Sequence, residues 1–309
     1  MPKKKENKLR ICIIGAGRLG LTLALCFSKN INKNLRLVSI TTKSSDSLVK
    51  AKEIITKLND QVAFFNDNYS AAKLANCILI CTPDSIIKNV CDELFIDKKL
   101  EGYGKAVIHF SGSKKLDVIN SAKEAGASIA CIHPIKSFAN YIESAKTIKN
   151  TLFGITYEKD DKAAINVIKV IIKFLNGKSV FVSNDNKPLY HACACIASNY
   201  LVALLNLATE IGENIGIKPE DYIGGLLNLS QGTLDNISKM GSKKSLTGPI
   251  ARGDITTIKD HLAQLEALKF PKEYIDAYKI MGILTLEIAF KNNWLKKETF
   301  DQFIEIFSY

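Results

Sequence analysis

Short apolar runs recur along the first half of the chain, and stretches with helical spacing separate them. Eight such runs are rich in β-branched and other apolar residues, and they cover residues 10–14, 35–40, 62–65, 77–81, 106–110, 128–132, 152–157 and 179–182. Continuous apolar strands that alternate with helices are typical of a parallel sheet with helices on both faces. The pattern therefore predicts an α/β first half.

The pattern changes after residue 184 to long helical repeats without a strand-like run. Residues 190–215 are apolar enough to predict a central, mostly buried helix. Asp254 is an expected N-cap, because apolar residues recur after it at spacings of three and four. A polar, turn-rich stretch at 183–188 separates the two patterns. We therefore expect a doubly wound, mostly parallel α/β domain over residues 1–184, followed by an all-α substrate and dimerisation domain over residues 185–309.

The first apolar run leads directly into a glycine-rich turn that opens a helical stretch. In a dinucleotide-binding turn of this kind, the first glycine makes the bend and the second lets the backbone approach the pyrophosphate, while the third packs helix on strand. The helix N-terminus adds amides and a dipole that favour an anion. A glycine turn without a ligand is the alternative, but the flanking strands and helix favour a dinucleotide site. Its residues are Gly15, Ala16, Gly17, Arg18, Leu19 and Gly20.

The residues after the second run indicate which dinucleotide binds. Thr41, Thr42, Lys43 and Ser44 stand where an NAD-specific site carries a carboxylate for the ribose 2′-hydroxyl. A carboxylate would repel a 2′-phosphate, whereas hydroxyls and a lysine would bind it. We therefore expect NADP(H) as the cofactor, although Lys43 is also typical of a solvated loop.

Two later runs end in loops that are expected to face the dinucleotide. Ligands of open α/β sheets lie beyond the carboxyl ends of the strands. Thr82 and Pro83 follow the run at 77–81, and Ser111 follows the run at 106–110, so these three residues are candidates for lining the nicotinamide. Asp84 is expected to cap the next helix.

Further candidates for substrate binding lie in two other loops. His133 and Ser137 follow the run at 128–132, where loops commonly carry function, although a His-Pro pair also suits a rigid turn. Arg252 lies near the end of the segment LTGPIARGD and suits a substrate carboxylate, which it would bind in a bidentate pair. A pair between Arg252 and Asp254 is the alternative.

One predicted helix carries the candidates for acid catalysis. His191, Cys195 and Asn199 are spaced by four residues and therefore share one helix face. Reduction of a carbonyl requires a proton for its oxygen, and a histidine suits that role at neutral pH. His191 is the expected proton donor, with Tyr190 and Lys187 as rivals. A buried Asn199 needs a hydrogen-bond partner, either another helix or the substrate.

Several motifs together resemble one known family. They are GAGRLG, the SG after the fifth run, HPIKSF, YHACACIASNYLVALL and LTGPIARGD. The combination is similar to Rossmann-like proteins with a helical C-terminal domain long catalogued as being of unknown function. Their wider group is the 6-phosphogluconate dehydrogenase-like superfamily, which includes hydroxyacid dehydrogenases and ketopantoate reductases. The resemblance implies NADP(H) chemistry on small acids and a homodimer built through the helical domain.

Ketopantoate reductases resemble the chain further in one helix. They carry a catalytic lysine followed by asparagines four and eight residues later, and the matching positions here are His191, Cys195 and Asn199. Asn199 fits this pattern, whereas His191 and Cys195 depart from it. The resemblance implies an NADPH-dependent reductase of a small 2-oxo acid, with ketopantoate to pantoate, a step of pantothenate biosynthesis, as the leading case. Another hydroxyacid dehydrogenase, an imine reductase and a non-catalytic NADPH sensor are the alternatives.

Charge and composition exclude several other classes. The chain has 42 Lys and Arg against 31 Asp and Glu, and residues 1–184 hold 29 of the basic and 16 of the acidic residues. No basic stripe with aromatic or motif support indicates a nucleic-acid partner. Arg18, Asn199 and Asn206 interrupt the longest apolar stretches, so no membrane span is expected. The eight cysteines lack metal-ligand spacing, which predicts reduced thiols and no metal site. Arg18 interrupts the apolar region that a secretory signal would need, so a cytoplasmic protein is expected.

Overall fold

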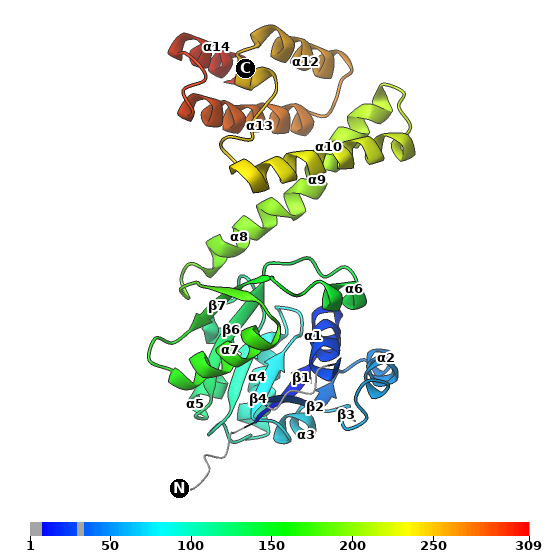
Figure 1. Ribbon diagram of the computed structural model, residues 1–309, viewed down its shortest axis with the longest axis vertical. Helices are drawn as coiled ribbons and strands as arrows, with labels where there is room; N and C mark the ends of the chain where they lie inside the picture. The colour runs from blue at the N-terminus through cyan, green and yellow to red at the C-terminus, as the bar shows by residue number, and fades with distance from the viewer. Residues whose placement is uncertain (1–7, 30–33, 309) are drawn as a thin grey trace. The chain divides into compact units, whose positions relative to one another are not determined.

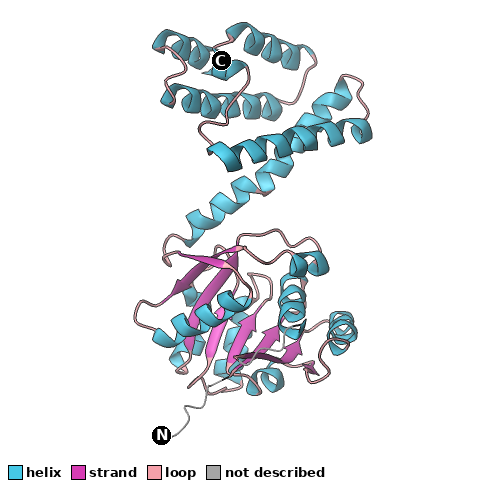
Figure 2. Ribbon diagram, in the orientation of Figure 1, coloured by secondary structure: helices cyan, strands magenta, loops and turns pink. Residues whose placement is uncertain are grey.

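The chain, described in a computed structural model over residues 8–29 and 34–308, divides into two compact units. The first unit runs to Asn199 and the second begins at Tyr200. Every strand of the described residues belongs to the first unit (Figure 2). The expected boundary after residue 184 falls where the sheet ends, whereas the contacts group the next helix with the sheet. Most of the basic N-terminal tail, residues 1–7, lies outside the described residues.

Eight strands form one sheet in the order β3-β2-β1-β4-β5-β6-β7-β8. All neighbouring pairs are parallel except β6 and β7, which are antiparallel. The first six strands have the order of a doubly wound dinucleotide-binding fold. The strands are β1 (Leu9–Ile14), β2 (Leu35–Thr41), β3 (Ala63–Phe65), β4 (Cys77–Ile80), β5 (Ala106–His109), β6 (Ser128–Pro134), β7 (Leu152–Tyr157) and β8 (Lys178–Phe181).

Helices connect the strands and cover both faces of the sheet (Figure 1). The longer ones are α1 (Arg18–Lys29), α2 (Ser45–Thr56) and α7 (Lys162–Phe174), while α8 (Lys187–Ala197) follows the last strand. The shorter ones are α3 (Asn68–Lys73), α4 (Ile87–Asp92), η1 (Glu93–Asp97), η2 (Leu116–Ile119), α5 (Asn120–Glu124) and α6 (Tyr141–Lys146). The predicted α/β architecture is confirmed, and it explains why the strands read as continuous apolar runs.

Each central strand is buried on both sides because two separate cores flank the sheet. In β1, Ile11 and Ile13 pack into the core that contains α1 and α7, whereas Cys12 and Ile14 pack into the core under α4 and α5. Successive side chains of a strand point to opposite faces, so both sets must be apolar. Full burial of such a side chain stabilises the fold by about 1.5 to 3 kcal/mol.

The second unit is entirely helical over its described residues. Its helices are α9 (Asn199–Asn214), whose first residue belongs to the first unit, α10 (Pro219–Met240), α11 (Pro249–Arg252), α12 (Ile255–Ala267), α13 (Lys272–Lys291) and α14 (Lys297–Ser308). Ile258, Leu286 and Phe303 form the centre of a core shared by α12, α13 and α14. Asp254 caps α12 as predicted, because its carboxylate accepts the Thr257 backbone N–H at 3.1 Å.

The single buried helix predicted over residues 190–215 is wrong in two respects. The helix is interrupted at Ser198, which separates α8 from α9. Its residues are also largely exposed: Lys187 alone is buried in α8, and Gly212 alone in α9. By length and composition alone, Lys187–Asn214 is the one described helical stretch that is apolar enough to cross a membrane. The apolar side chains of this stretch therefore lie on the surface of the chain and not in its own hydrophobic core.

Candidate active site

The glycine turn after β1 has the geometry of a dinucleotide-binding loop. Gly15 has φ +102°, a left-handed conformation that favours glycine, and a Cβ there would lie 2.9 Å from the Cys81 carbonyl carbon. A Cβ on Gly20 would lie 1.9 Å from the Gly15 carbonyl oxygen, so α1 needs this glycine to pack on the turn. By contrast, a Cβ on Gly17 would meet nothing within 4 Å. Gly15 thus allows the bend, Gly17 leaves open space, and Gly20 allows α1 to pack closely on the turn.

The start of α1 suits an anion. Arg18 is the first helical residue and is exposed, and the first turn contains no acidic side chain. The first amides of a helix have no partner within the helix, and the dipole adds partial positive charge there. Open space above Gly17, free amides and a basic side chain therefore fit a pyrophosphate.

The loops after β4 and β5 lie beside this turn, because β1, β4 and β5 are neighbours in the sheet. The Thr82 hydroxyl is buried and has no hydrogen-bond partner among the described residues. An orphaned buried hydroxyl is costly unless a ligand satisfies it. It therefore fits a bound dinucleotide, as expected for Thr82.

Asp84 has a different role from the predicted one. The cap position of α4 is Ile86, so Asp84 does not cap this helix. Its carboxylate instead accepts hydrogen bonds from the hydroxyls of Ser111 at 2.5 Å and Ser113 at 3.3 Å. The pair Asp84 and Ser111 fastens the loop after β4 to the loop after β5.

The four residues expected near the 2′-phosphate are not equivalent. Thr41 is buried, and its hydroxyl donates to Asn68 Oδ1 at 3.4 Å. Ser44 caps α2 by accepting the Ser47 backbone N–H at 3.3 Å. Between Thr41 and Ser44, Thr42 is half-buried and Lys43 is exposed. Thr42 and Lys43 are therefore the side chains of this turn that remain available to a ligand.

Three aromatic side chains from β6 and α8 form the centre of the site. Tyr190 Oη lies 3.1 Å from His133 Nδ1 and 3.3 Å from the His133 carbonyl oxygen. The His133 and His191 ring centroids are 5.9 Å apart, with the rings nearly perpendicular. The single Tyr190 proton serves both contacts when the hydroxyl donates to the carbonyl and His133 Nδ1–H donates to the hydroxyl. In that arrangement His133 Nε2 is free to accept a proton or a hydrogen bond.

Two glycines allow these rings to approach the backbone: Gly112, which the sequence singled out only as part of the SG motif, and Gly154, which sequence reasoning missed. A Cβ on Gly112 would lie 2.5 Å from His191 Nδ1 and 2.9 Å from His133 Nε2. A Cβ on Gly154 would lie 2.4 Å from Tyr190 Oη. Gly112 follows Ser111, so the loop expected to line the nicotinamide is the same loop that contacts both histidines.

A cavity of about 450 Å³ opens beside the two histidines, and all its lining residues belong to the first unit. Its polar lining includes Ser137, an expected substrate ligand, and Asn199, a candidate from the catalytic helix, together with Lys136 and Ser198. No carboxylate is among the lining residues of this described cavity. Asn199 is exposed, so its predicted need for a buried partner does not arise. A cavity with a lysine, amide and hydroxyl donors but no acid suits a substrate that carries a carboxylate.

The expected proton donors differ in their access to this cavity. His191 lines it, and its Nε2 lies 3.6 Å from Cys195 Sγ. Tyr190 lies behind His133, and Lys187 is buried away from the cavity. Arg252 ends α11 in the second unit and is not one of the residues that this cavity brings together.

Burial determines the protonation states around the site. Desolvation, followed by the charge of Lys187, lowers the pKa of His133 to about 4 and that of His109 to about 3. Desolvation also raises the pKa of Tyr190 to about 12. At neutral pH, His133 is therefore an uncharged imidazole and Tyr190 keeps its proton.

These two histidines should make the protein sensitive to mild acid. Their ordinary pKa of 6.5 applies in the unfolded chain, so below pH 6.5 the unfolded chain binds protons that the folded chain does not. The stability that the two neutral histidines contribute is therefore fully present above pH 6.5, and it is lost as the pH drops toward 4 and then toward 3. We expect the Tm from circular dichroism to decline across this window. His133→Gln should reduce the decline, and an equal decline in both proteins would contradict the assignment.

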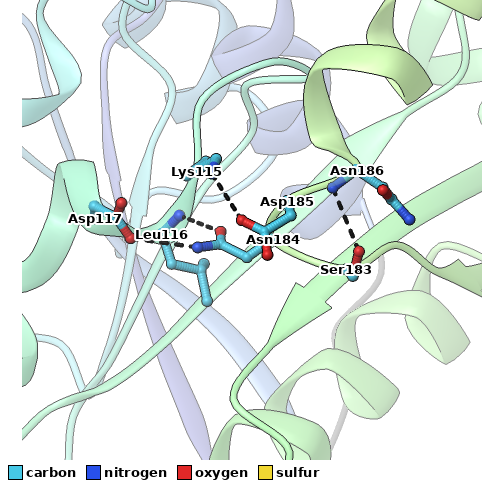
Figure 3. A network of polar contacts seen from close by, with 7 residues as sticks. All are labelled: Lys115, Leu116, Asp117, Ser183, Asn184, Asp185 and Asn186. Atoms are coloured by element: carbon cyan, nitrogen blue, oxygen red, sulfur yellow. Dashed lines mark hydrogen bonds and ion pairs between the residues drawn. The ribbon is translucent and has the colours of Figure 1, made fainter.

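The turn before α8 is fastened to the loop after β5 (Figure 3). Asn184 Oδ1 accepts the Leu116 backbone N–H at 2.8 Å, and its amide donates to Asp117 at 3.3 Å. Lys115 and Asp185 form an ion pair at 2.7 Å beside them. The polar stretch predicted as a domain boundary is thus an anchor that places α8 on the site.

Two family profiles match the chain, each over one part. A Rossmann-like domain matches residues 2–134, and a domain of unknown function (DUF2520) matches residues 151–285. The second match begins just before β7, so it spans the last strands of the sheet and much of the helical unit. A comparison with curated proteins finds no matching sequence. The profiles confirm the resemblance to Rossmann-like proteins with a helical domain of unknown function.

Solved structures share this fold over nearly the whole chain. Protein TM1727 from Thermotoga maritima is 25% identical with a TM-score of 0.68, over 92% of this chain and 99% of its own. A pyrroline carboxylate reductase from Plasmodium falciparum, solved with NADP bound, is 16% identical with a TM-score of 0.57, over 92% and 99%. A reductive aminase from Aspergillus terreus, solved with NADPH and ethyl-5-oxohexanoate, is 13% identical with a TM-score of 0.60, over 96% and 98%. These likenesses establish the fold of a Rossmann-like unit followed by a helical unit.

Proposed function

We propose that the protein is an NADPH-dependent reductase of a small 2-oxo acid, with ketopantoate as the leading substrate. The observation that carries the proposal is the pair His133 and His191 at a cavity without carboxylates, in contact with Gly112 of the loop after β5. Reductases that share the fold and were solved with NADP or NADPH support the cofactor. The resemblance to ketopantoate reductases at Asn199 supports the substrate class.

Different residues of the chain would have different roles in such a reaction. The glycine turn and the start of α1 would hold the pyrophosphate, and Thr82, Pro83 and Ser111 would lie along the nicotinamide. When bound, the dinucleotide supplies the hydride. Lys136, Ser137 and Asn199 would bind the carboxylate in the cavity. Arg252, at the end of α11, stays a predicted carboxylate ligand. His191 would then deliver the proton to the carbonyl oxygen.

A second candidate is reduction of a carbon-nitrogen double bond. Two of the solved structures with this fold are a pyrroline carboxylate reductase and a reductive aminase, which favours this alternative. The same cavity suits either reaction, because in both the hydride adds to carbon and the oxygen or nitrogen of the double bond needs a proton. The nature of the reacting bond then distinguishes the two candidates.

One substrate panel tests both candidates. Purified protein is mixed with NADPH and, in separate reactions, with 2-oxo acids that include ketopantoate, with cyclic imino acids, and with ketones plus amines. Loss of reduced-nicotinamide absorbance with the 2-oxo acids supports the proposal, and loss only with the nitrogen compounds supports the alternative. Tight NADPH binding without turnover of any member would favour a non-catalytic sensor.

Lys43 tests the cofactor assignment separately. Lys43→Glu removes a cation and adds an anion at the turn expected to bind the 2′-phosphate. A hydrogen bond to a charged group contributes about 1.5 to 3 kcal/mol, so NADPH affinity should fall by about 10-fold or more while NADH affinity stays the same. Isothermal titration calorimetry measures both. Lys52→Glu on the exposed side of α2 is the matched charge control, and an equal effect of the two changes would refute the role.

The homodimer implied by the family resemblance is also part of the proposal. None of the 22 residues of α10 is buried, and Leu189, Val202 and Leu229 are 71%, 67% and 70% exposed. Exposed apolar surface of this extent is typical of an interface. We expect light scattering to give twice the chain mass of 34.1 kDa, and Val202→Lys to shift the protein toward monomer. A monomeric wild type that floats with lipid vesicles would instead indicate a membrane partner for the apolar stretch.

A further inference from the structure

Lys187 is the most deeply buried charged side chain near the site. It is 1% exposed, although it is the first residue of α8. Its Nζ donates to the Ser111 carbonyl oxygen at 2.9 Å and to Cys131 Sγ at 3.0 Å. Among the described residues, no salt bridge joins it to a carboxylate.

This placement is unfavourable for stability in two ways. Burial removes the hydration of an ammonium group, and the positive end of the helix dipole repels a cation in the first turn. A neutral residue at this position would avoid both costs. The position of the lysine therefore indicates a role in the site and not only in folding.

The ammonium joins the three segments that carry the central residues. Ser111 precedes Gly112 on the loop after β5, and Cys131 lies on β6 two residues before His133. Cys131 Sγ–H also donates to the Ser111 carbonyl oxygen at 3.2 Å, so the lysine closes a triangle of contacts. Lys187 itself begins the helix that carries His191. A shift of this ammonium would move Gly112 relative to both histidines that it touches.

We propose that Lys187 is a positioning residue, whose buried ammonium holds the Ser111 and Gly112 backbone against His133 and His191 so that the proton donor faces the substrate. The catalytic part of the proposal rests on the proposed reductase function. Its structural part, the control of His133 by Lys187, does not depend on any substrate.

The charges around His133 give this proposal a direct readout. Lys187, Tyr190 and His191 face it from α8, Asp84 lies beyond β4 and His109 ends β5, while Lys136 follows on its own loop. Apart from burial, Lys187 is the largest influence that keeps the imidazole neutral, and Asp84 acts in the opposite direction. Removal of the ammonium should therefore raise the pKa of His133 toward its ordinary value of 6.5.

Two variants separate charge from hydrogen bonding. Lys187→Met keeps the length of the side chain and removes both the charge and the donors, whereas Lys187→Gln keeps a neutral donor. Lys291→Met, which removes only a surface ion pair with Glu287 on α13, is the control. His133 is followed by NMR titration of labelled histidines, and kcat and KM are measured as functions of pH. Lys187→Arg keeps the positive charge. A His133 pKa near the wild-type value in this variant would show that charge alone is sufficient.

We expect Lys187→Met and Lys187→Gln to raise the His133 pKa and to lower kcat by about 10-fold or more, because a small misplacement near reacting groups has effects of this size. Lys291→Met should match the wild type. Folded variants with an unchanged His133 pKa and unchanged kcat would overturn the proposal. If neither variant folds, the wild-type titration decides, because a His133 pKa near 6.5 would also overturn it. A wild type that reduces nothing defeats the proposed function alone, since the titration still reports on Lys187.

Discussion

His191→Ala should lower kcat by about 100-fold or more, the size of effect typical of a lost general acid. His191 is the proposed donor that lines the cavity, and its ring packs against Gly112 of the loop after β5. The proposed ligands of the substrate carboxylate are other side chains, so KM for the acid should change much less than kcat. Steady-state kinetics with the best substrate of the panel measures both constants.

Two further variants make the result specific. Tyr190→Phe removes the hydroxyl at 3.1 Å from His133 Nδ1 and should give a smaller loss, because Tyr190 would act through His133. His261→Ala is the matched control, since His261 also contacts a tyrosine hydroxyl, that of Tyr278 at 2.7 Å, but on α12 and α13. A wild-type kcat in His191→Ala, together with a large loss in Tyr190→Phe, would move the donor role to Tyr190.

Gly20→Ala should prevent the glycine turn from forming. The added Cβ would lie 1.9 Å from the Gly15 carbonyl oxygen, which is backbone and therefore cannot rotate away. Overpacking of a rigid contact destabilises a fold by about 1 to 3 kcal/mol, and occasionally more. We expect the upper end of this range in urea unfolding, together with loss of NADPH binding.

Gly17→Ala in the same turn is the matched control. Nothing lies within 4 Å of the new Cβ, and Gly17 does not have a positive φ. The free energy of unfolding should change by less than about 0.5 kcal/mol, as at an ordinary surface position. NADPH affinity should still fall, because the methyl group would occupy the space proposed for the pyrophosphate. Unchanged affinity in Gly17→Ala would show that the dinucleotide does not approach this residue.

The strands and the glycine turn were predictable because their causes are local. A strand that is buried on both faces must be apolar at every position, so the run at 77–81 coincides with β4, which is buried at all four positions. The turn from Gly15 to Gly20 is contiguous. Gly20 packs on the turn itself, Gly15 packs on the residues after β4, and Gly17 leaves open space. Adjacent residues in the sequence are then sufficient to define the shape.

The histidine cluster was only partly predictable. His133 and Tyr190 were separate candidates, and their separation of 57 positions in the sequence gives no sign of the 3.1 Å contact. Gly112 and Gly154 carry no local signal, because each is needed only where a distant ring packs on it. The order of strands in the sheet and the anchoring of α8 by Asn184 bring these residues together.

The sequence by itself determined the α/β class, the nucleotide turn and the helical second half, since periodicity and glycine spacing follow from backbone geometry. Only the tertiary structure decided that Lys187 lies behind the site, that Asp84 binds Ser111, and that α8 and α9 expose their apolar side chains. The type of a residue, apolar or charged, does not indicate which distant residues will pack against it. Its partners are selected when distant segments pack, and that packing determines which side chains can reach a substrate.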